Sequence, residues 1–179
     1  MVKPDTFYIC LFWINSFGFT NASYKFNSLK CFFYSPEWGK INLCQIKAID
    51  RNHNMMNIEG ILNRNITEIE INFKILKRES GGWHPFMYDI TMDVCKFFKN
   101  RRSFFIANLI YSFLKPFTNV NHTCPYPAGS VLQLWNWTPN ENGVLKVFPV
   151  DHGQYALHTT WSIKKVPVLK IDGSVLFYK

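Results

Sequence analysis

The feature that most constrains this 179-residue chain is a run of eight residues in which polar and large apolar side chains alternate. The run covers residues 68–75, and its apolar members share one face of an extended chain. These members are Ile69, Ile71, Phe73 and Ile75. A charged turn that ends in glycine follows over 77–82, and residues 83–94 read as the returning strand. The pattern predicts a β-hairpin with one apolar face and one polar face.

Further short extended runs occupy both sides of this hairpin. They cover residues 29–33, 41–50, 131–137, 144–150, 155–163, 166–171 and 175–178. Turn signals separate them, among them Pro36–Gly39, 140–143 and the pair Asp172-Gly173. Strands at this spacing predict a mainly β chain that folds as an antiparallel, immunoglobulin-like β-sandwich in a single domain over 23–179.

The period of the apolar pattern changes over residues 103–115. Apolar residues recur there at helical spacing, Ser103 stands where a helix cap is expected, and Pro116 follows the last turn. We therefore expect one inserted helix over 103–115. Two interpretations of it stay open, because periodicity alone does not separate a helix buried in the core from a helix that lines a lipid-accessible cavity.

The N-terminus carries a short apolar stretch over residues 7–19, which begins after Lys3. Thr20 and Ala22 place small residues before a cleavage point, so residues 1–22 read as a signal peptide of a secreted, extracellular protein. The alternative is a buried N-terminal strand or helix. No apolar run reaches the roughly 18–20 residues that a membrane-spanning helix needs.

Four cysteines remain after this segment, an even number that suits disulfides in a secreted chain. Four cysteines allow three pairings. Their positions favour Cys31–Cys44, which a hairpin through the Pro36–Gly39 turn would bring together, and Cys95–Cys124, which bracket the expected helix. Three sequons add a prediction of N-glycosylation. Their acceptor residues are Asn65, Asn121 and Asn136.

Signatures of catalysis are missing from the sequence, which holds no G-x-S-x-G, no H-E-x-x-H and no glycine-rich phosphate loop. Asp89 and Asp93 would share a strand face but lie roughly 13 Å apart. Glycosidase carboxylates lie only roughly 5–9.5 Å apart. The spacing of the cysteines and histidines matches no zinc site. We expect no enzymatic activity, no metal and no cofactor.

The chain is basic, with a formal net charge of +8, which favours acidic partners. The basic residues gather in two places. They are Lys96, Lys99, Arg101 and Arg102 before the expected helix, and Lys164 and Lys165 near the C-terminus. Secretion argues against nucleic acid as the partner. The remaining interpretations are a solvated surface, or contact with a receptor, with acidic glycans or with the anionic headgroups of a membrane surface.

Two sequence blocks carry a resemblance to a known family. The first reads D-V-C-K-F from Asp93, and the second reads N-H-T-C-P-Y from Asn121. With the stretch 44–47 and the segment 153–161, they resemble the large family of small secreted insect proteins of unknown function that includes the CheB chemosensory proteins. The resemblance covers nearly all of residues 23–179. That family is in turn similar to the ML lipid-recognition domains, which are β-sandwiches that hold acyl chains between their sheets.

The resemblance implies an ML-like domain that binds a lipid or another hydrophobic small molecule in a slot between two sheets, as a monomer and in a chemosensory setting. The slot lining would come from inward strand positions and from the helix. We expect it to include Ile71, Phe73, Phe86, Tyr88, Phe97, Phe105, Leu109, Phe113 and Trp161. The alternative is a secreted protein-interaction module with a filled core and no ligand.

Overall fold

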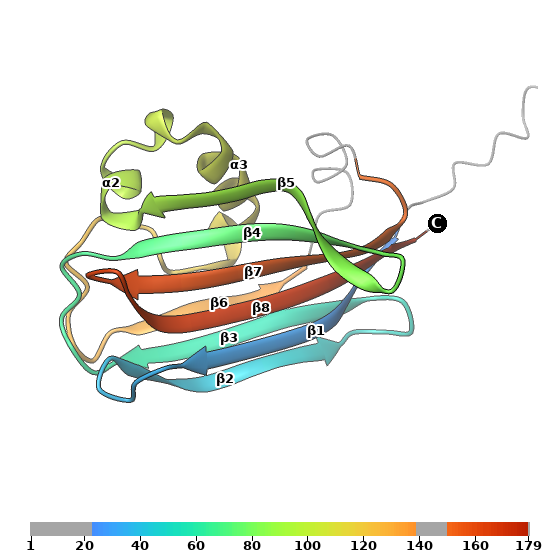
Figure 1. The fold of residues 1–179 in the computed structure, drawn as a ribbon. Helices are drawn as coiled ribbons and strands as arrows, with labels where there is room; N and C mark the ends of the chain where they lie inside the picture. The colour runs from blue at the N-terminus through green and yellow to red at the C-terminus, as the bar shows by residue number, and fades with distance from the viewer. Residues whose placement is uncertain (1–22, 139–149, 179) are drawn as a thin grey trace, which may run out of the picture.

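The computed structural model describes residues 23–138 and 150–178, and it is a mainly β, antiparallel sandwich as the sequence predicts (Figure 1). The strands are β1 (Ser23–Phe33), β2 (Gly39–Ala48), β3 (Asn54–Leu62), β4 (Glu70–Glu79), β5 (Gly82–Asp93), β6 (Val131–Trp137), β7 (Gly153–Ile163) and β8 (Val166–Tyr178). The predicted signal peptide over 1–22, and all but the last residue of the predicted strand over 144–150, lie outside the described residues.

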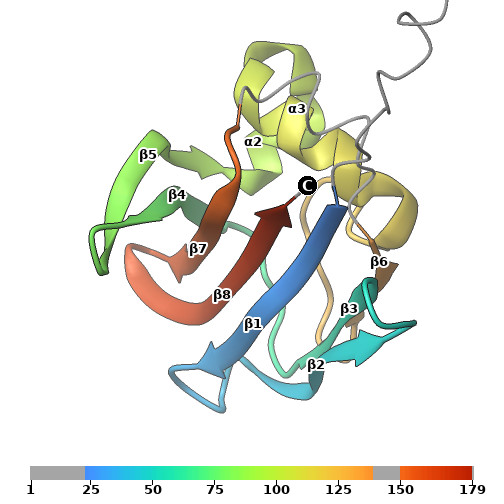
Figure 2. The ribbon, with the colours of Figure 1, turned by 90° about the vertical axis from the view of Figure 1, so that its right-hand side faces the viewer.

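The strands form two sheets. One has five strands in the order β1-β8-β7-β4-β5, and the other has three in the order β2-β3-β6. Figure 2 shows the two sheets facing each other, with β1 next to β2 on one side of the sandwich. The opposite side, between β5 and β6, is covered by two helices, α2 (Val94–Lys99) and α3 (Phe105–Leu114).

Residues 70–75 of the alternating run form the first part of β4, and Ile71 and Phe73 separate from their polar neighbours as predicted, whereas residues 68 and 69 precede the strand. Ile71 and Phe73 point inward and are only 8% and 4% exposed. On the outer face, Lys74 forms an ion pair of 2.8 Å with Asp89 of β5. The inward positions continue across the sheet, because Ile71 lies opposite Trp161 of β7 in the ladder.

Strand β5 is the edge strand of the five-stranded sheet, and its pairing with β4 is irregular. The register shifts between Lys74 and Leu76, so that residues 86–88 lie opposite Ile75 alone. Pro85 sits at this shift, which suits a residue that cannot donate a backbone hydrogen bond. The hairpin is confirmed, but its first strand extends to Glu79 and its returning strand begins at Gly82.

Two parts of the sheets differ from the prediction. Strand β3 was not predicted, because its residues 54–62 lack polar and apolar alternation. The predicted turn at Asp172-Gly173 is wrong, because both residues continue the ladder inside β8. Gly173 lies where the facing sheet comes close, since a Cβ atom placed there would meet Met56 Cε at 3.4 Å.

The helical segment is more complex than one helix over 103–115. Helix α2 was not predicted, and the Asp93 side chain caps it by accepting a hydrogen bond of 2.9 Å from the Lys96 N–H. Helix α3 begins two residues later than expected. Ser103 does not cap it, because Ser103 belongs to the short helix η3 (Arg101–Ser103) and Phe104 is the residue before the first turn. A second short helix, η4 (Lys115–Phe117), follows α3.

Both predicted disulfide pairings are confirmed. Cys31–Cys44 joins β1 to β2 with 6.1 Å between the Cα atoms. The two strands belong to different sheets, so the expected hairpin between them is wrong and the bond ties the sheets together. Cys95–Cys124 ties α2 to the segment before β6, at 5.2 Å between the Cα atoms. A closure of either length is typically worth about 3–4 kcal/mol.

None of the helices in the described ranges is long and apolar enough to cross a membrane.

Candidate functional site

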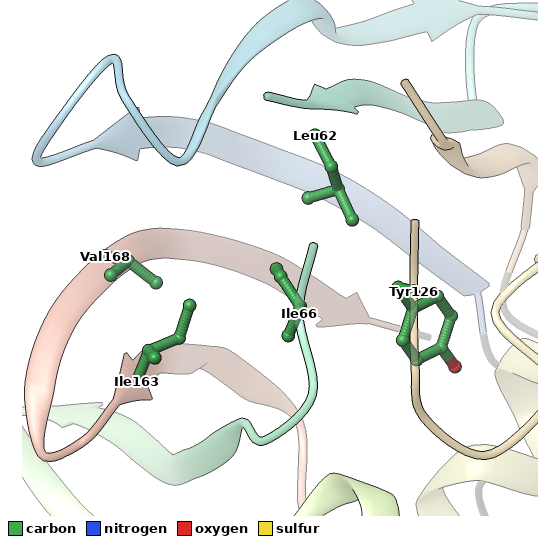
Figure 3. Close-up of a cluster of buried hydrophobic side chains, with 5 residues drawn as sticks. All are labelled: Leu62, Ile66, Tyr126, Ile163 and Val168. Carbon is green, nitrogen blue, oxygen red and sulfur yellow. The ribbon is translucent and has the colours of Figure 1, made fainter. Parts of the chain in front are cut away.

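The apolar interior is divided into two separate clusters. The first, here called the end cluster, closes one end of the sandwich and consists of Leu62, Ile66, Tyr126, Ile163 and Val168. Figure 3 shows these side chains gathered from β3, from the β7–β8 hairpin and from two connecting segments. The second, here called the helix cluster, consists of Phe73, Phe97, Ala107 and Tyr111.

The end cluster is held by hydrogen bonds as well as by packing. Ile66 and Tyr126 form an isolated bridge in which each N–H donates to the other residue's carbonyl, at 2.8 and 2.9 Å. The Tyr126 hydroxyl donates to the carbonyl of His122. Burial raises the pKa of Tyr126 to about 12, with a smaller contribution from Tyr111. The two connecting segments thus seal this end of the sandwich.

The helix cluster fixes α3 over the inner face of β4 and β5. Phe97 is 2% exposed and meets the Tyr111 ring edge-on, with 5.6 Å between ring centroids. The Arg101 guanidinium lies 4.9 Å from the centroid of the same tyrosine ring and donates to the Asn121 carbonyl at 3.2 Å. Burial raises the pKa of Tyr111, and Arg101 opposes the rise. The helices are therefore anchored to the sheet by aromatic packing.

Between the clusters lie four inward-facing side chains that belong to neither. We call them the slot residues: Ile58 and Leu134 of the three-stranded sheet, and Trp161 and Ile171 of the five-stranded sheet. All four are only half-buried. A close-packed sandwich buries the middle of its inner faces most completely.

Along strand β7, burial is lower in the middle of the strand than at its ends, which is the opposite of what a close-packed sandwich shows. It is the middle strand of the five-stranded sheet, and its two ends are well buried, with Tyr155 at 7% and Ile163 at 6% exposure. The inward-facing residues between them, Leu157, Thr159 and Trp161, are half-buried. The inward-facing side chains in the middle of β7 are thus less completely buried than those at its two ends.

The polar atoms beside the slot residues are already paired. The Thr159 hydroxyl donates to the Ile171 carbonyl at 2.9 Å and accepts a hydrogen bond of 3.2 Å from Trp161 Nε1. Because each donor has its acceptor, this wall presents an apolar surface.

One buried donor is left over near the slot residues. Trp137 lies on β6 opposite Met56, and its ring packs on Phe26 with 5.0 Å between centroids. Its Nε1 atom is shielded from solvent and has no hydrogen-bond partner in the described part of the chain. A buried N–H without an acceptor costs about 1–3 kcal/mol. The site therefore combines apolar walls with one unused donor.

The nine residues that the sequence predicted for the slot lining do not form one surface. Phe73 and Phe97 belong to the helix cluster, and Tyr88 packs against it. Ile71 and Trp161 lie directly opposite each other at the edge of the open middle. Phe86 lies farther along the β4–β5 hairpin. There its ring contacts Tyr155, with 5.3 Å between centroids, and the Lys77 ammonium lies 5.8 Å from its centroid.

The predicted helix stripe faces another way. Phe105 is 75% exposed, so its predicted inward position is wrong, and Leu109 and Phe113 on the same flank are half-buried. The helix instead presents Ala107 and Tyr111 to the sheet, a pair at i and i+4 in which the small alanine lets the helix approach closely. The slot residues Ile58, Leu134 and Ile171 were not among the residues predicted from the sequence. Only the apolar runs that contain Leu134 and Ile171 gave any signal for them.

The three predicted glycosylation acceptors, Asn65, Asn121 and Asn136, are all exposed. Asn136 adopts a left-handed backbone with φ of 52°, a conformation that asparagine tolerates, and its N–H donates to Asn57 Oδ1 at 2.6 Å. Within residues 23–138 and 150–178, no three His, Cys, Asp or Glu side chains are grouped so as to hold a metal ion.

Residues 71–157 match a protein family described as "Protein of unknown function (DUF1091)". The match covers just under half of the chain. It runs from Ile71 in β4 to Leu157 in β7 and contains the β4–β5 hairpin, both helices, β6 and the Cys95–Cys124 disulfide. No curated protein matches the chain significantly. The match thus points to an uncharacterised domain family and supplies no activity, so function has to be argued from the geometry.

Proposed function

We propose that this protein is a secreted, non-catalytic binder of an amphiphilic lipid, whose acyl chain lies against the slot residues between the two sheets. The observation that carries the proposal is the division of the core into two clusters, with half-buried, inward-facing apolar side chains between them. A chain in this position would complete the burial that the protein alone leaves unfinished.

The free energy of such binding is set by the length of the acyl chain. Each methylene removed from water contributes about 0.8 kcal/mol, so a ten-carbon chain contributes about 8 kcal/mol before the losses of association. Those losses begin at about 4 kcal/mol. Affinity should therefore rise steeply with chain length, and chains of about five carbons or fewer should gain nothing.

The polar end of the ligand would meet one hydrogen-bond donor of the protein. The unpaired Trp137 Nε1 would donate to a carbonyl, hydroxyl or carboxylate oxygen of the lipid, which removes the cost of the buried donor. The proposed ligand is thus an amphiphile with an acceptor oxygen at one end of its chain, for which a fatty acid is the simplest probe.

Secretion is part of the same proposal. The two disulfides are of the kind that persists in oxidising compartments, and the sequon acceptors lie exposed on the surface. A chemosensory carrier role, implied by the resemblance to the CheB proteins, would be one use of a lipid-binding slot.

The decisive experiment fills the slot. Ile171→Trp should abolish binding of a fluorescent fatty acid and leave the thermal midpoint nearly unchanged, because the added ring occupies space that the ligand would take. The matched control is Val168→Phe in the end cluster, where overpacking should cost about 1–3 kcal/mol and leave probe binding below the midpoint intact. Val168 is 2% exposed, so no space is available there.

One combined outcome decides against the proposal. If the wild-type protein binds no fatty acid, and Ile171→Trp lowers the midpoint as much as Val168→Phe does, the middle is filled core and the interaction-module alternative is favoured.

Trp137→Phe tests the polar anchor separately. It should weaken binding of a fatty acid by about three- to tenfold and leave binding of a hydrocarbon probe unchanged, since one neutral hydrogen bond contributes about 0.5–1.5 kcal/mol.

A further inference from the structure

The helical segment carries the most exposed large apolar side chain in the described part of the chain. Phe105, the first residue of α3, is 75% exposed, and Leu109 and Phe113 continue the same flank at i+4 and i+8. A single exposed phenylalanine is ordinary on a protein surface. A ridge of three large apolar residues on one helix flank is less common. The basic residues around it indicate what it contacts.

The charge around this ridge has one sign. From residue 94 to residue 138 the chain has no aspartate or glutamate. The same stretch carries five basic residues, which are Lys96, Lys99, Arg101, Arg102 and Lys115. Lys96 is partly neutralised by Asp93 at 3.6 Å, and Arg101 is stacked on aromatic rings. In the described part of the chain, Lys99, Arg102 and Lys115 are exposed and make no ion pair.

The position of the segment matters as much as its composition. Helices α2 and α3 lie along the side of the sandwich between β5 and β6, which is the side away from the β1–β2 junction (Figure 2). The helix cluster fixes them to the inner face of β4 and β5, next to the slot residues. A surface that meets these helices therefore meets the side by which the space between the sheets would be reached.

We propose that α2 and α3 form a docking surface for a bilayer with anionic headgroups, with Phe105 inserted at the interface and Lys99, Arg102 and Lys115 beside the headgroups. A helix that presents apolar side chains next to unpaired cations has the chemistry of interfacial membrane helices. Each basic side chain near an anionic surface strengthens binding about fivefold. Docking would serve to load or unload the slot, and this purpose rests on the proposed function. The docking itself is independent of the proposed function.

The charge arm of the test uses vesicles of phosphatidylcholine with and without one third phosphatidylglycerol, and measures binding by co-sedimentation. The wild-type protein should bind the anionic vesicles, and high salt should release it. Lys99→Glu with Arg102→Glu should weaken binding at least about 25-fold, since two contributions of about fivefold are lost. The matched control is Lys164→Glu with Lys165→Glu at the β7–β8 turn. It changes net charge equally and should weaken binding by less than about threefold.

The apolar arm replaces the exposed ring. Phe105→Ser should weaken vesicle binding about tenfold or more, since a buried phenylalanine side chain is worth about 1.5–3 kcal/mol, with no change in thermal midpoint. Phe32→Ser, at a β1 position that is 57% exposed, is the control and should bind vesicles as the wild type does.

Docking is overturned if the wild type binds neutral and anionic vesicles equally, or if the two charge-reversal pairs weaken binding equally, because the effect is then one of net charge alone. It is also overturned if the protein ignores vesicles but the same lysine and arginine are needed to bind an acidic polysaccharide. Failure of the slot has a separate signature. In that case the fatty-acid probe does not bind in vesicle-free solution while vesicle binding persists, and the Phe105→Ser variant should bind the probe normally if the slot exists.

Discussion

The end cluster and the slot residues lie on the same inner faces, yet the first is fully buried and the second is only half-buried. The five members of the end cluster are each 6% exposed or less, whereas the slot residues are half-buried. Ile163 and Trp161 make the contrast sharpest, because they lie two positions apart on β7. The difference teaches that burial in this sandwich is most complete at one end and under the helices, and less complete at the slot residues between them.

The source of the difference is the chain outside the sheets. At the end cluster, Ile66 and Tyr126 come from connecting segments and bridge across the gap between the sheets. On the other side, α3 supplies Ala107 and Tyr111 to cover β4 and β5. The slot residues between these two places come from the sheets themselves, on β3, β6, β7 and β8.

The largest expected effect compares two aromatic residues of different burial. Phe97→Ala should cost about 3–5 kcal/mol, because it removes a fully buried ring and leaves a cavity in the helix cluster. Trp161→Ala removes a larger but half-buried ring beside the slot, and should cost less than about 2 kcal/mol, since part of its area is already in contact with water. Urea unfolding of the two variants measures both. Equal costs would mean that the middle is as tightly packed as the clusters.

A second prediction sharpens the comparison through pH. The pKa of Tyr126 is raised by burial to about 12, above its ordinary value of about 10. The unfolded chain therefore loses this proton first, so the stabilisation is complete below about pH 10 and is lost as the pH rises through about 12. Titration of tyrosinate absorbance should show a late step that disappears in Tyr126→Phe.

The matched control for that titration is Tyr155→Phe. Tyr155 also has a pKa raised chiefly by burial, but it lies at the other end of β7. The late step near pH 12 should persist in this variant. At neutral pH, Tyr126→Phe should cost about 1 kcal/mol, because the hydrogen bond to the His122 carbonyl is lost. A late step that survives in Tyr126→Phe would belong to another tyrosine, and the prediction for Tyr126 would then be wrong.

The parts of the fold that the sequence predicted are those whose local pattern and tertiary role agree. The alternation in β4 reports which face is inward because one face of that strand packs and the other is wet. The bounds of β6, Val131–Trp137, match the prediction in full, since turn residues flank it. The disulfide pairing follows from position along the chain, although the reason given for Cys31–Cys44 was wrong because those strands lie in different sheets.

The parts that sequence could not predict depend on partners far away in the chain. Helix α3 is apolar almost all round, so periodicity could not choose between the flank of Phe105 and the face of Tyr111. The choice is made by Phe97 and Arg101, which hold Tyr111 from outside the helix. The slot residue Ile58 comes from β3, whose apolar residues show no strand period. Whether the inward-facing side chains of one sheet pack against those of the other depends on both sheets, whose strands are far apart in the sequence.

The smallest expected effect tests the slot with a change of one methylene. Ile163→Val in the end cluster should cost about 0.5–1.5 kcal/mol, because the surrounding atoms cannot close the cavity. Ile171→Val among the slot residues should cost less than about 0.5 kcal/mol in the ligand-free protein, since Ile171 is only half-buried. Saturating fatty acid raises the free energy of unfolding, because it binds only the folded state. The size of this increase reports the contact between the acyl chain and residue 171. The increase should be smaller in Ile171→Val than in the wild type and unchanged in Ile163→Val. If the ligand stabilises all three proteins equally, the acyl chain does not lie against Ile171, and the comparison between a filled end and an open middle loses its functional meaning.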